Sequence, residues 1–378
     1  MAQVVPFTSA AKKHRERIMS LAFVPGGAVQ QLTTGANLQI KAYPYLRALW
    51  LHVTAAGGGG GTVAADGPWN ALSSILVTDT NGSAIYGSQV FTGFDAYLAH
   101  LFSGHADITD PTLYPFHVGT APNFEFGLRI GLEYNPRTGA GALPNMSSNA
   151  AYGLTLNGNT SAAIFSAAPT TMPTVTVDVW MECWTLPDAN DLLGRQQMQG
   201  PPLLGTTQYT VKQSFPNLQP SSQNTVTLTR KGNMIRKWIF VLRNSSAVRI
   251  ASTLYPNPFE FWWDGNRLTS DDPKYLQAIT TEQNAGLLQS ASTAFLPTGV
   301  LPYEFSAPYE VDYGGDGEGG WLATTQSSRL ELVGSNWGAG VSSLDVITLD
   351  VAPIALANQY ALDSQTGKLL YPAQPETR

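Results

Sequence analysis

Apolar and polar residues alternate along many short stretches of the chain. The clearest stretch runs from Phe124 to Tyr134, where every second residue is Phe, Leu, Ile or Tyr and the residues between are Glu, Gly or Arg. Because successive side chains of a strand point to opposite faces, this pattern predicts a half-buried antiparallel strand. The alternation from Val175 to Cys183 predicts a second one.

Further stretches rich in β-branched and aromatic residues, each bounded by turn residues, predict more strands. They lie at residues 38–53, 72–79, 152–157, 224–230, 234–243, 257–263, 328–333 and 344–351. Helical periodicity is scarce. It predicts helices at 91–102 and 271–279, and a short basic helix at 9–20.

The order of these elements repeats along the chain. Residues 45–51 resemble residues 234–240, and each segment is followed by a strand that ends in a turn, by a helix, and by a closing strand that runs into proline. Such a repeat indicates two domains of one fold. Many short strands with long loops favour jelly rolls, in which two sheets pack face to face. We therefore predict an all-β protein of two tandem eight-stranded jelly rolls, with a few short helices in loops.

The predicted boundaries follow from the repeat and from a Pro-rich and Gly-rich connection between the halves. They are an N-terminal basic arm at 1–20, a first jelly roll at 21–190, a linker at 191–208, a second jelly roll at 209–357 and a C-terminal tail at 358–378.

Composition adds that the protein has few charges. Charged residues make up 13% of the chain and the net charge is −6. So small a charged share indicates a protein that covers much of its surface with partners. The basic arm is small and the rest is acidic, so we expect no direct contact with nucleic acid. We find no signal peptide or apolar run of membrane-spanning length, and one cysteine, Cys183, so we expect folding in the cytoplasm.

Titratable residues form no recognised catalytic motif. His105, Asp107 and Asp110 lie close together, but polar loop side chains are the simpler interpretation. Carboxylates in a Gly-rich segment can hold calcium, although a surface acidic loop is again simpler. Those carboxylates are Asp312, Asp316 and Glu318.

Two carboxylate pairs, Glu125 with Glu133 and Asp178 with Glu182, each share a strand face. Paired carboxylates are typical of glycosidases, but solvated sheet faces or subunit contacts are the simpler interpretation. Cys183 is expected to be a buried hydrophobic residue. We therefore predict no catalytic residue, no metal site and no cofactor, and expect that the protein is not an enzyme.

Trp180 and Trp184 fall on the polar face of their predicted strand. Aromatic residues in such positions are typical anchors of an interface, so we predict that both contact another subunit. The alternative function is a carbohydrate-binding or carbohydrate-active β-sandwich protein, in which exposed tryptophans would form the sugar platform.

The order of several motifs resembles the major capsid proteins of tectivirus-like phages. The motifs are a basic arm, a strand with Tyr45-x-Arg47, Asp66-Gly67-Pro68-Trp69, a strand ending in Asp79-Thr80-Asn81-Gly82, and an aromatic helix with Phe94 and Tyr97. Length and doubling match over nearly the whole chain, although the second half has no counterpart of Asp-Gly-Pro-Trp. The resemblance implies a double jelly-roll major capsid protein of a membrane-containing icosahedral virus.

The same resemblance implies the partners of the chain. They are two further copies in a homotrimer that forms a pseudo-hexagonal capsomer, neighbouring capsomers, vertex (penton) and minor capsid proteins, and an inner viral membrane beneath the shell. The arm would contact the membrane or a neighbour through Lys12, Lys13, Arg15 and Arg17. The expected location is the virion capsid.

Overall fold

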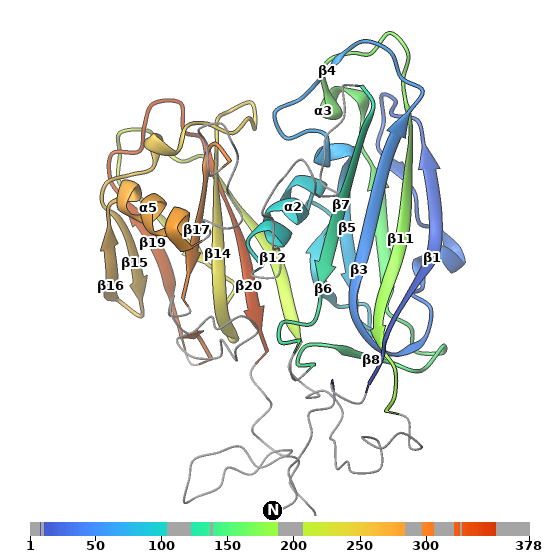
Figure 1. Cartoon of the computed structure of the whole chain (residues 1–378). Coiled ribbons are helices and arrows are strands. Elements are labelled where there is room, and N and C mark those ends of the chain that lie inside the picture. The colour runs from blue at the N-terminus through green and yellow to red at the C-terminus, as the bar shows by residue number, and fades with distance from the viewer. Residues whose placement is uncertain are drawn as a thin grey trace, which may run out of the picture.

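The computed structural model of the chain is built mainly from strands, with short helices between them (Figure 1). It describes residue 8 and residues 11–103, 122–136, 139–187, 207–283, 297–305, 321–325 and 327–352. Within these residues the strands form two sandwiches of facing sheets, one from each half of the chain.

The first half folds as a jelly roll, called here the first roll. One of its sheets has the strand order β1 (Lys13–Phe23), β11 (Thr174–Trp184), β3 (Tyr43–Ala56) and β7 (Phe124–Gly131), with β8 (Leu143–Asn145) also on β3. The facing strands are in the order β2 (Gln30–Gln31), β9 (Gly153–Gly158), β5 (Leu72–Thr78) and β6 (Ala84–Ser88). Two short strands, β4 (Thr62–Val63) and β10 (Phe165–Ala167), pair with each other in a separate small sheet; β4 follows β3 in sequence and β10 precedes β11.

The second half repeats this order and is called here the second roll. One sheet has the order β12 (Gln208–Pro216), β20 (Ser343–Val351), β14 (Met234–Arg243) and β17 (Val300–Glu304), with β18 (Leu322–Ala323) also on β14. The facing sheet has the order β13 (Asn224–Leu228), β19 (Leu330–Gly334), β15 (Phe259–Trp263) and β16 (Asn266–Asp271). In both rolls the first main strand pairs with the last, which is the jelly-roll topology.

Helices occupy the same place in both rolls, between the fifth and sixth main strands. They are α2 (Gly93–Leu101) and α5 (Pro273–Gln283); α3 (Ser161–Ile164) and 3-10 turns at Gly35–Leu38, Trp69–Ala71 and Ser252–Leu254 complete the described elements. Thr92 caps α2 in a capping box: its side chain accepts from the backbone of Asp95, whose carboxylate accepts from the backbone of Thr92 at 2.8 Å. The helices predicted at 91–102 and 271–279 are confirmed.

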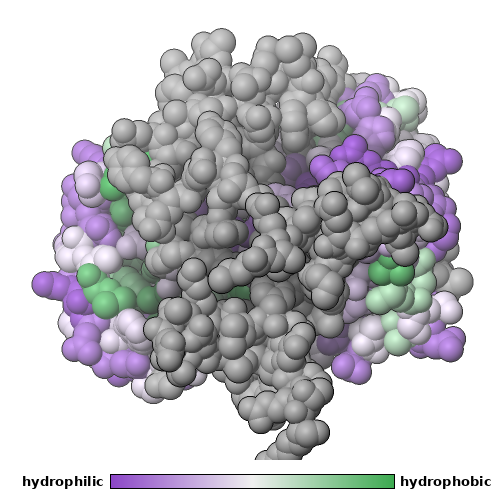
Figure 2. All heavy atoms as spheres, turned by 60° about the horizontal axis from the view of Figure 1, so that its bottom comes forward, coloured by the Kyte–Doolittle hydropathy of each residue, from purple (hydrophilic) through white to green (hydrophobic). Residues whose placement is uncertain are grey.

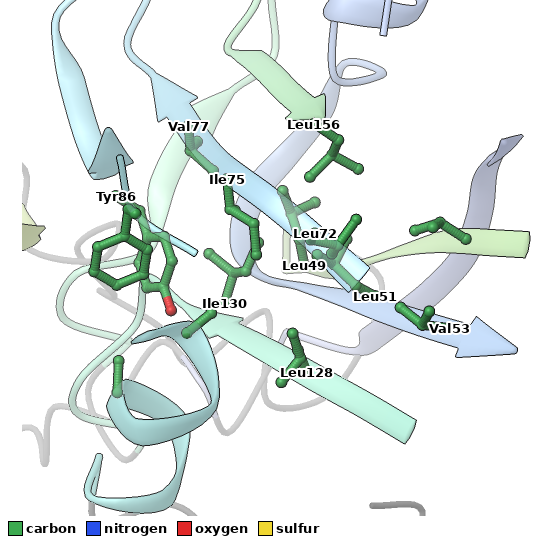
Figure 3. Packing of buried hydrophobic residues seen from close by; sticks show 14 of the residues in the cluster. Leu49, Leu51, Val53, Leu72, Ile75, Val77, Tyr86, Leu128, Ile130 and Leu156 are labelled. Atoms are coloured by element: carbon green, nitrogen blue, oxygen red, sulfur yellow. The ribbon is translucent and has the colours of Figure 1, made fainter. Parts of the chain in front are cut away.

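Alternation places the core of the first roll between its two sheets. Leu49 and Leu51 of β3 point toward Leu72 and Ile75 of β5, and all four are fully buried (Figure 3). The predicted double jelly-roll fold is confirmed.

The short basic helix predicted at residues 9–20 is wrong, because residues 13–23 form the edge strand β1. This strand pairs with β11 along its length, and Leu21 and Phe23 point into the core.

The predicted arm boundary at residue 20 falls inside β1. The predicted end of the linker at 208 meets the first residue of β12; the rest of that linker from 191 to 206 and the predicted tail at 358–378 lie outside the described residues.

Candidate assembly surfaces and the contact between the rolls

The two rolls are joined by a packed interface. β6 of the first roll and β12 of the second are bridged side by side at Tyr86 and Thr210, so the sheets continue from one roll into the other. α2 lies against β20, and Ile239, Val241 and Ile347 of the second roll belong to the same buried cluster as the core of the first roll. Shared apolar burial therefore stabilises one orientation of the two rolls.

A charged contact crosses this interface at Asp66, in the turn that precedes β5. Its carboxylate accepts hydrogen bonds from Arg243 at 2.6 Å and from Arg249 at 2.5 Å. Arg249 also donates to the carbonyl oxygen of Ala65 at 2.7 Å, and its guanidinium lies 4.5 Å from the ring centroid of Phe94. The first roll supplies the anion and the second roll supplies both cations.

Lys212 of β12 extends the contact toward α2. Its ammonium lies 2.9 Å from the carboxylate of Asp95 and 3.3 Å from that of Asp345 in β20. Arg243 donates to Asp345 at 2.9 Å, and the hydroxyl of Ser214 donates to it at 2.6 Å. These six alternating charges form what we call the inter-roll charge network. Its members are Asp66, Asp95, Lys212, Arg243, Arg249 and Asp345.

Opposite charges in the network counteract the effect of burial on the pKa of three of its members. Burial alone would raise the pKa of Asp345, but Lys212 and the other partners outweigh it and lower that pKa below its usual value. Burial would lower the pKa of Lys212, but Asp95 and Asp345 raise it above its usual value. The pKa of Arg243 is raised in the same way, since Asp66, Asp345 and Asp95 together outweigh burial. Opposite charges thus favour the ionised forms of Asp345, Lys212 and Arg243.

Lys237 of β14 makes a second polar contact across the interface. Its ammonium donates to the carbonyl oxygen of Phe102 at 2.6 Å and lies 3.0 Å from Glu304. Phe102 follows the last residue of α2, where helix carbonyls lack helical partners and the dipole favours a cation. Lys212 and Lys237 therefore bind opposite ends of one helix, which fixes α2 on the second roll.

The inter-roll charge network is not evident from the sequence pattern. Asp66 entered only as part of the Asp-Gly-Pro-Trp motif, and its partners were not singled out. The available signal was the charge inside apolar strands: Arg243 ends β14, and Asp345 interrupts the apolar run of β20. Buried charges in such positions are normally paired, but the sequence alone does not say with what.

The two tryptophans predicted as interface anchors have different environments. Trp180 is 41% exposed on the outer face of β11, the face that points away from the core, and it is paired with Trp50 of β3. Trp184 is only 4% exposed, because it clusters with Tyr45 and other buried residues near that end of the sheet. Its indole nitrogen donates to Glu133 at 2.5 Å. Trp184 is thus a packing residue of its own chain, which corrects its predicted role as a subunit anchor.

The basic residues predicted to lie on the arm are at the start of β1. They are Lys12, Lys13, Arg15 and Arg17. The arginines are paired with acidic residues of β11: Arg15 lies 2.5 Å from Glu182, and Arg17 lies 3.6 Å from Asp178. Lys12 and Lys13 are both exposed, so they are the members of the set whose charge is most available to a partner.

The carboxylates considered for glycosidase chemistry are each matched by a basic side chain. Glu133 lies 2.5 Å from Arg47, and Glu125 lies 2.7 Å from the imidazole of His52. Asp178 and Glu182 are the partners of Arg17 and Arg15, as described above. Carboxylates that each bind a separate basic side chain do not present the facing acid and nucleophile of a glycosidase.

Cys183 is fully buried, as predicted, and burial raises its pKa to about 12.

The candidate metal ligands lie outside the described residues. They are His105, Asp107 and Asp110 in one loop and the acidic residues Asp312, Asp316 and Glu318. Among the residues that the structure does describe, no group of three or more His, Cys, Asp or Glu side chains is placed to hold a metal ion. No helix in the same part of the chain is long and apolar enough to span a membrane.

The described surface carries scattered hydrophobic residues. Seen from the end at the bottom of Figure 1, its flanks are mainly hydrophilic with small separate hydrophobic patches (Figure 2). Large hydrophobic side chains that are more than 40% exposed include Val24, Val29, Val90, Met146, Trp180, Leu186, Val248, Leu268 and Tyr275. Among these, the two aromatic residues are the strongest candidates for contacts with a partner, because aromatic side chains dominate interface energetics.

Known proteins resemble this chain in fold but not in sequence. No protein-family model matches the chain, and no curated protein matches its sequence. Solved structures do match its fold, and the fold they share with it over almost the whole chain is the double jelly roll.

Three of these structures come from different viruses. A chain of Sulfolobus turreted icosahedral virus matches with a TM-score of 0.60 and 12% identity, covering 91% of this chain and 92% of that one. The major capsid protein of bacteriophage PM2 matches with a TM-score of 0.52 and 11% identity, covering 90% and 98%. PBCV-1 VP54, fitted into a reconstruction of the virophage Sputnik, matches with a TM-score of 0.57 and 12% identity, covering 90% and 94%.

Proposed function

We propose that this chain is the major capsid protein of a tailless icosahedral virus with an internal membrane. Three copies form a pseudo-hexagonal capsomer, and capsomers tile the shell together with vertex (penton) and minor capsid proteins. The chain is made and folded in the cytoplasm of the host and has a structural rather than a catalytic role.

One observation carries the proposal: the double jelly roll of this chain matches structures from several viruses over at least 90% of its length, among them the major capsid protein of bacteriophage PM2 and the PBCV-1 virus capsid. Two similar rolls in one chain also suit the geometry of a shell. Three chains supply six rolls around a three-fold axis, so one polypeptide makes a nearly hexagonal tile with closed symmetry.

Electron microscopy of the purified protein tests this proposal. We expect two-dimensional class averages in negative stain to show six-lobed, nearly hexagonal particles with the mass of a trimer. A monomer at all concentrations would overturn the trimeric capsomer, and binding and hydrolysis of glycans would then be measured.

The arm is proposed to contact anionic lipid beneath the shell through Lys12 and Lys13. Reversing both charges in Lys12→Glu/Lys13→Glu is expected to weaken binding to vesicles that contain anionic lipid by at least about tenfold, since each basic residue contributes about 1 kcal/mol near such a surface. Co-sedimentation with the vesicles measures this loss. The control is Lys231→Glu, which reverses an exposed charge of the second roll.

The fold should not change in the Lys12→Glu/Lys13→Glu variant, because neither side chain is buried. Deletion of residues 1–20 is not a suitable test, since it removes most of β1 together with its pairing to β11. Unchanged vesicle binding by the double variant would contradict the proposed membrane contact.

A further inference from the structure

The two rolls can be matched residue by residue through a shared bulge. In β3, Arg47 is an extra residue that has no partner in the ladder with β11. In β14, Arg236 is an extra residue at the same place in the ladder with β20. A bulge shifts the register at one defined point, so the two arginines align the third main strand and the last main strand of the rolls.

Counting from the bulge relates an exposed surface to a buried one. Trp50 and its partner Trp180 in the first roll correspond to Ile239 and its partner Ile347 in the second. Ile239 and Ile347 are fully buried, because the first roll covers this face of the second. Trp180, in contrast, is 41% exposed. The outer face of this sheet is therefore covered by the first roll in the second roll, whereas the corresponding face of the first roll is exposed.

The charged residues of the two faces correspond as well. Arg17 is opposite Trp180 as Lys212 is opposite Ile347, and Asp178 matches Asp345 by the same register. Arg17 and Asp178 lie 3.6 Å apart with side chains 55% and 22% exposed, whereas Lys212 and Asp345 lie 3.3 Å apart with side chains 8% and 7% exposed. The cation–anion pair that the second roll buries against α2 thus has a counterpart in the first roll that is more exposed to solvent.

The helix that would cover such a face is also present in an exposed form. Asp272 accepts from the backbone of Lys274 and precedes α5 as Thr92 precedes α2. The third residue after this cap is Tyr275 in α5 and Asp95 in α2. Asp95 binds Lys212 across the inter-roll interface, while Tyr275 is 62% exposed.

We propose that α5 of one chain docks on the outer face of the β1–β11–β3–β7 sheet of a second copy. Tyr275 then lies against Arg17 and Trp180, where its ring can stack on the indole and accept the guanidinium on its face. The contact repeats between chains the one that α2 makes within a chain.

This proposal rests on the proposed capsomer and defines its subunit contact. The contact is head to tail, because the surface on one copy differs from the surface on the other. Such a contact closes into a ring only when its rotation divides a full turn. If the step from the second roll of one chain to the first roll of the next matches the step between the two rolls of one chain, and the two steps together make a third of a turn, three copies place six rolls in a closed ring.

Cross-linking between introduced cysteines tests the contact in the full chain. The double variant Trp180→Cys/Tyr275→Cys, treated with a short flexible bis-maleimide, is expected to give covalent dimers and trimers in a denaturing gel. Each single variant should stay monomeric, and a mixture of the two should give dimers but no trimers. Native Cys183 should not interfere, because it is buried and its pKa is about 12.

A charge substitution gives a second readout. Tyr275→Arg places a cation against Arg17 and is expected to weaken trimer formation at least about 30-fold, the effect of losing an interface hot spot. Sedimentation velocity measures the trimer. The matched control is Leu268→Arg, which adds the same charge at a residue of the second roll that is 45% exposed.

The outcomes separate the contact from the capsomer. A stable trimer that gives no cross-link in the double variant, or that tolerates Tyr275→Arg, would overturn this contact and leave the proposed capsomer intact. Cross-linked dimers from either single variant would show a symmetric contact and would also overturn it. An unmodified chain that is monomeric at every concentration would overturn both proposals.

Discussion

Replacing Trp184 with alanine is expected to lower the free energy of unfolding by about 3–5 kcal/mol, the usual cost of truncating a buried tryptophan. The indole is 4% exposed, and the guanidinium of Arg47 lies 4.1 Å from its ring centroid. Truncation also leaves Glu133, which is 1% exposed, without the indole donor. Denaturation with urea, followed by circular dichroism, measures the loss.

Trp180→Ala is the matched control, since it removes the same side chain four residues earlier on the same strand. Because Trp180 is 41% exposed, its loss should change the free energy of unfolding by less than about 1 kcal/mol while it weakens association of subunits. Trp184→Phe should fall between the two, because it keeps most of the packing and loses the hydrogen bond to Glu133. Equal destabilisation by the two alanine variants would contradict these roles.

The fold could be predicted from the sequence where side chains alternate between core and solvent. The stretch from Phe124 to Tyr134 shows this directly, since Phe124, Phe126, Leu128 and Ile130 all lie in the core. The repeat was visible because both rolls place a turn after the fourth main strand and a helix after the fifth. Local pattern and tertiary packing agree in these elements, so the structure there can be predicted from the sequence.

The first main strand of each roll could not be predicted in the same way. β1 begins with mostly charged residues, and its local pattern fits a basic helix equally well; only pairing with β11 decides for a strand. β12 lies at the junction of the rolls, so residues on both of its faces meet protein and the alternation is lost. Lys212 occupies a buried position there because Asp95 and Asp345 are its partners.

The candidate sites depended on contacts that no local pattern encodes. Trp180 and Trp184 share a strand face, but Tyr45 and Ala142 are packed around only the second of them. The inter-roll charge network is further removed from sequence patterns. Asp66 and Arg243 are 177 residues apart in sequence, and they meet only after both rolls have folded and docked.

Removing the carboxylate of Asp66 is expected to lower the free energy of unfolding by about 3–5 kcal/mol, because it leaves buried cations without their partner. In Asp66→Ala, Arg243 keeps Asp345 and the carbonyl oxygen of Ala247. Arg249 keeps backbone carbonyls and the ring of Phe94. Denaturation with urea measures the total effect. Hydrogen exchange should show increased opening at α2 and β20, where the rolls meet, before the two cores open.

A double-mutant cycle with Arg249→Met isolates the contact across the interface. If Asp66 mainly compensates the buried charge of Arg249, the double variant should be clearly more stable than the sum of the two single losses predicts, by at least about 1 kcal/mol. Arg267→Ala serves as a surface control: it removes an ion pair whose arginine side chain is 54% exposed, and it should change the free energy of unfolding by no more than about 0.5 kcal/mol. Strict additivity, or a loss in Asp66→Ala no larger than in the surface control, would mean that Asp66 and Arg249 have no part in holding the first roll on the second. The orientation of the rolls would then rest on apolar burial and on the contacts that Lys212 and Lys237 make with α2.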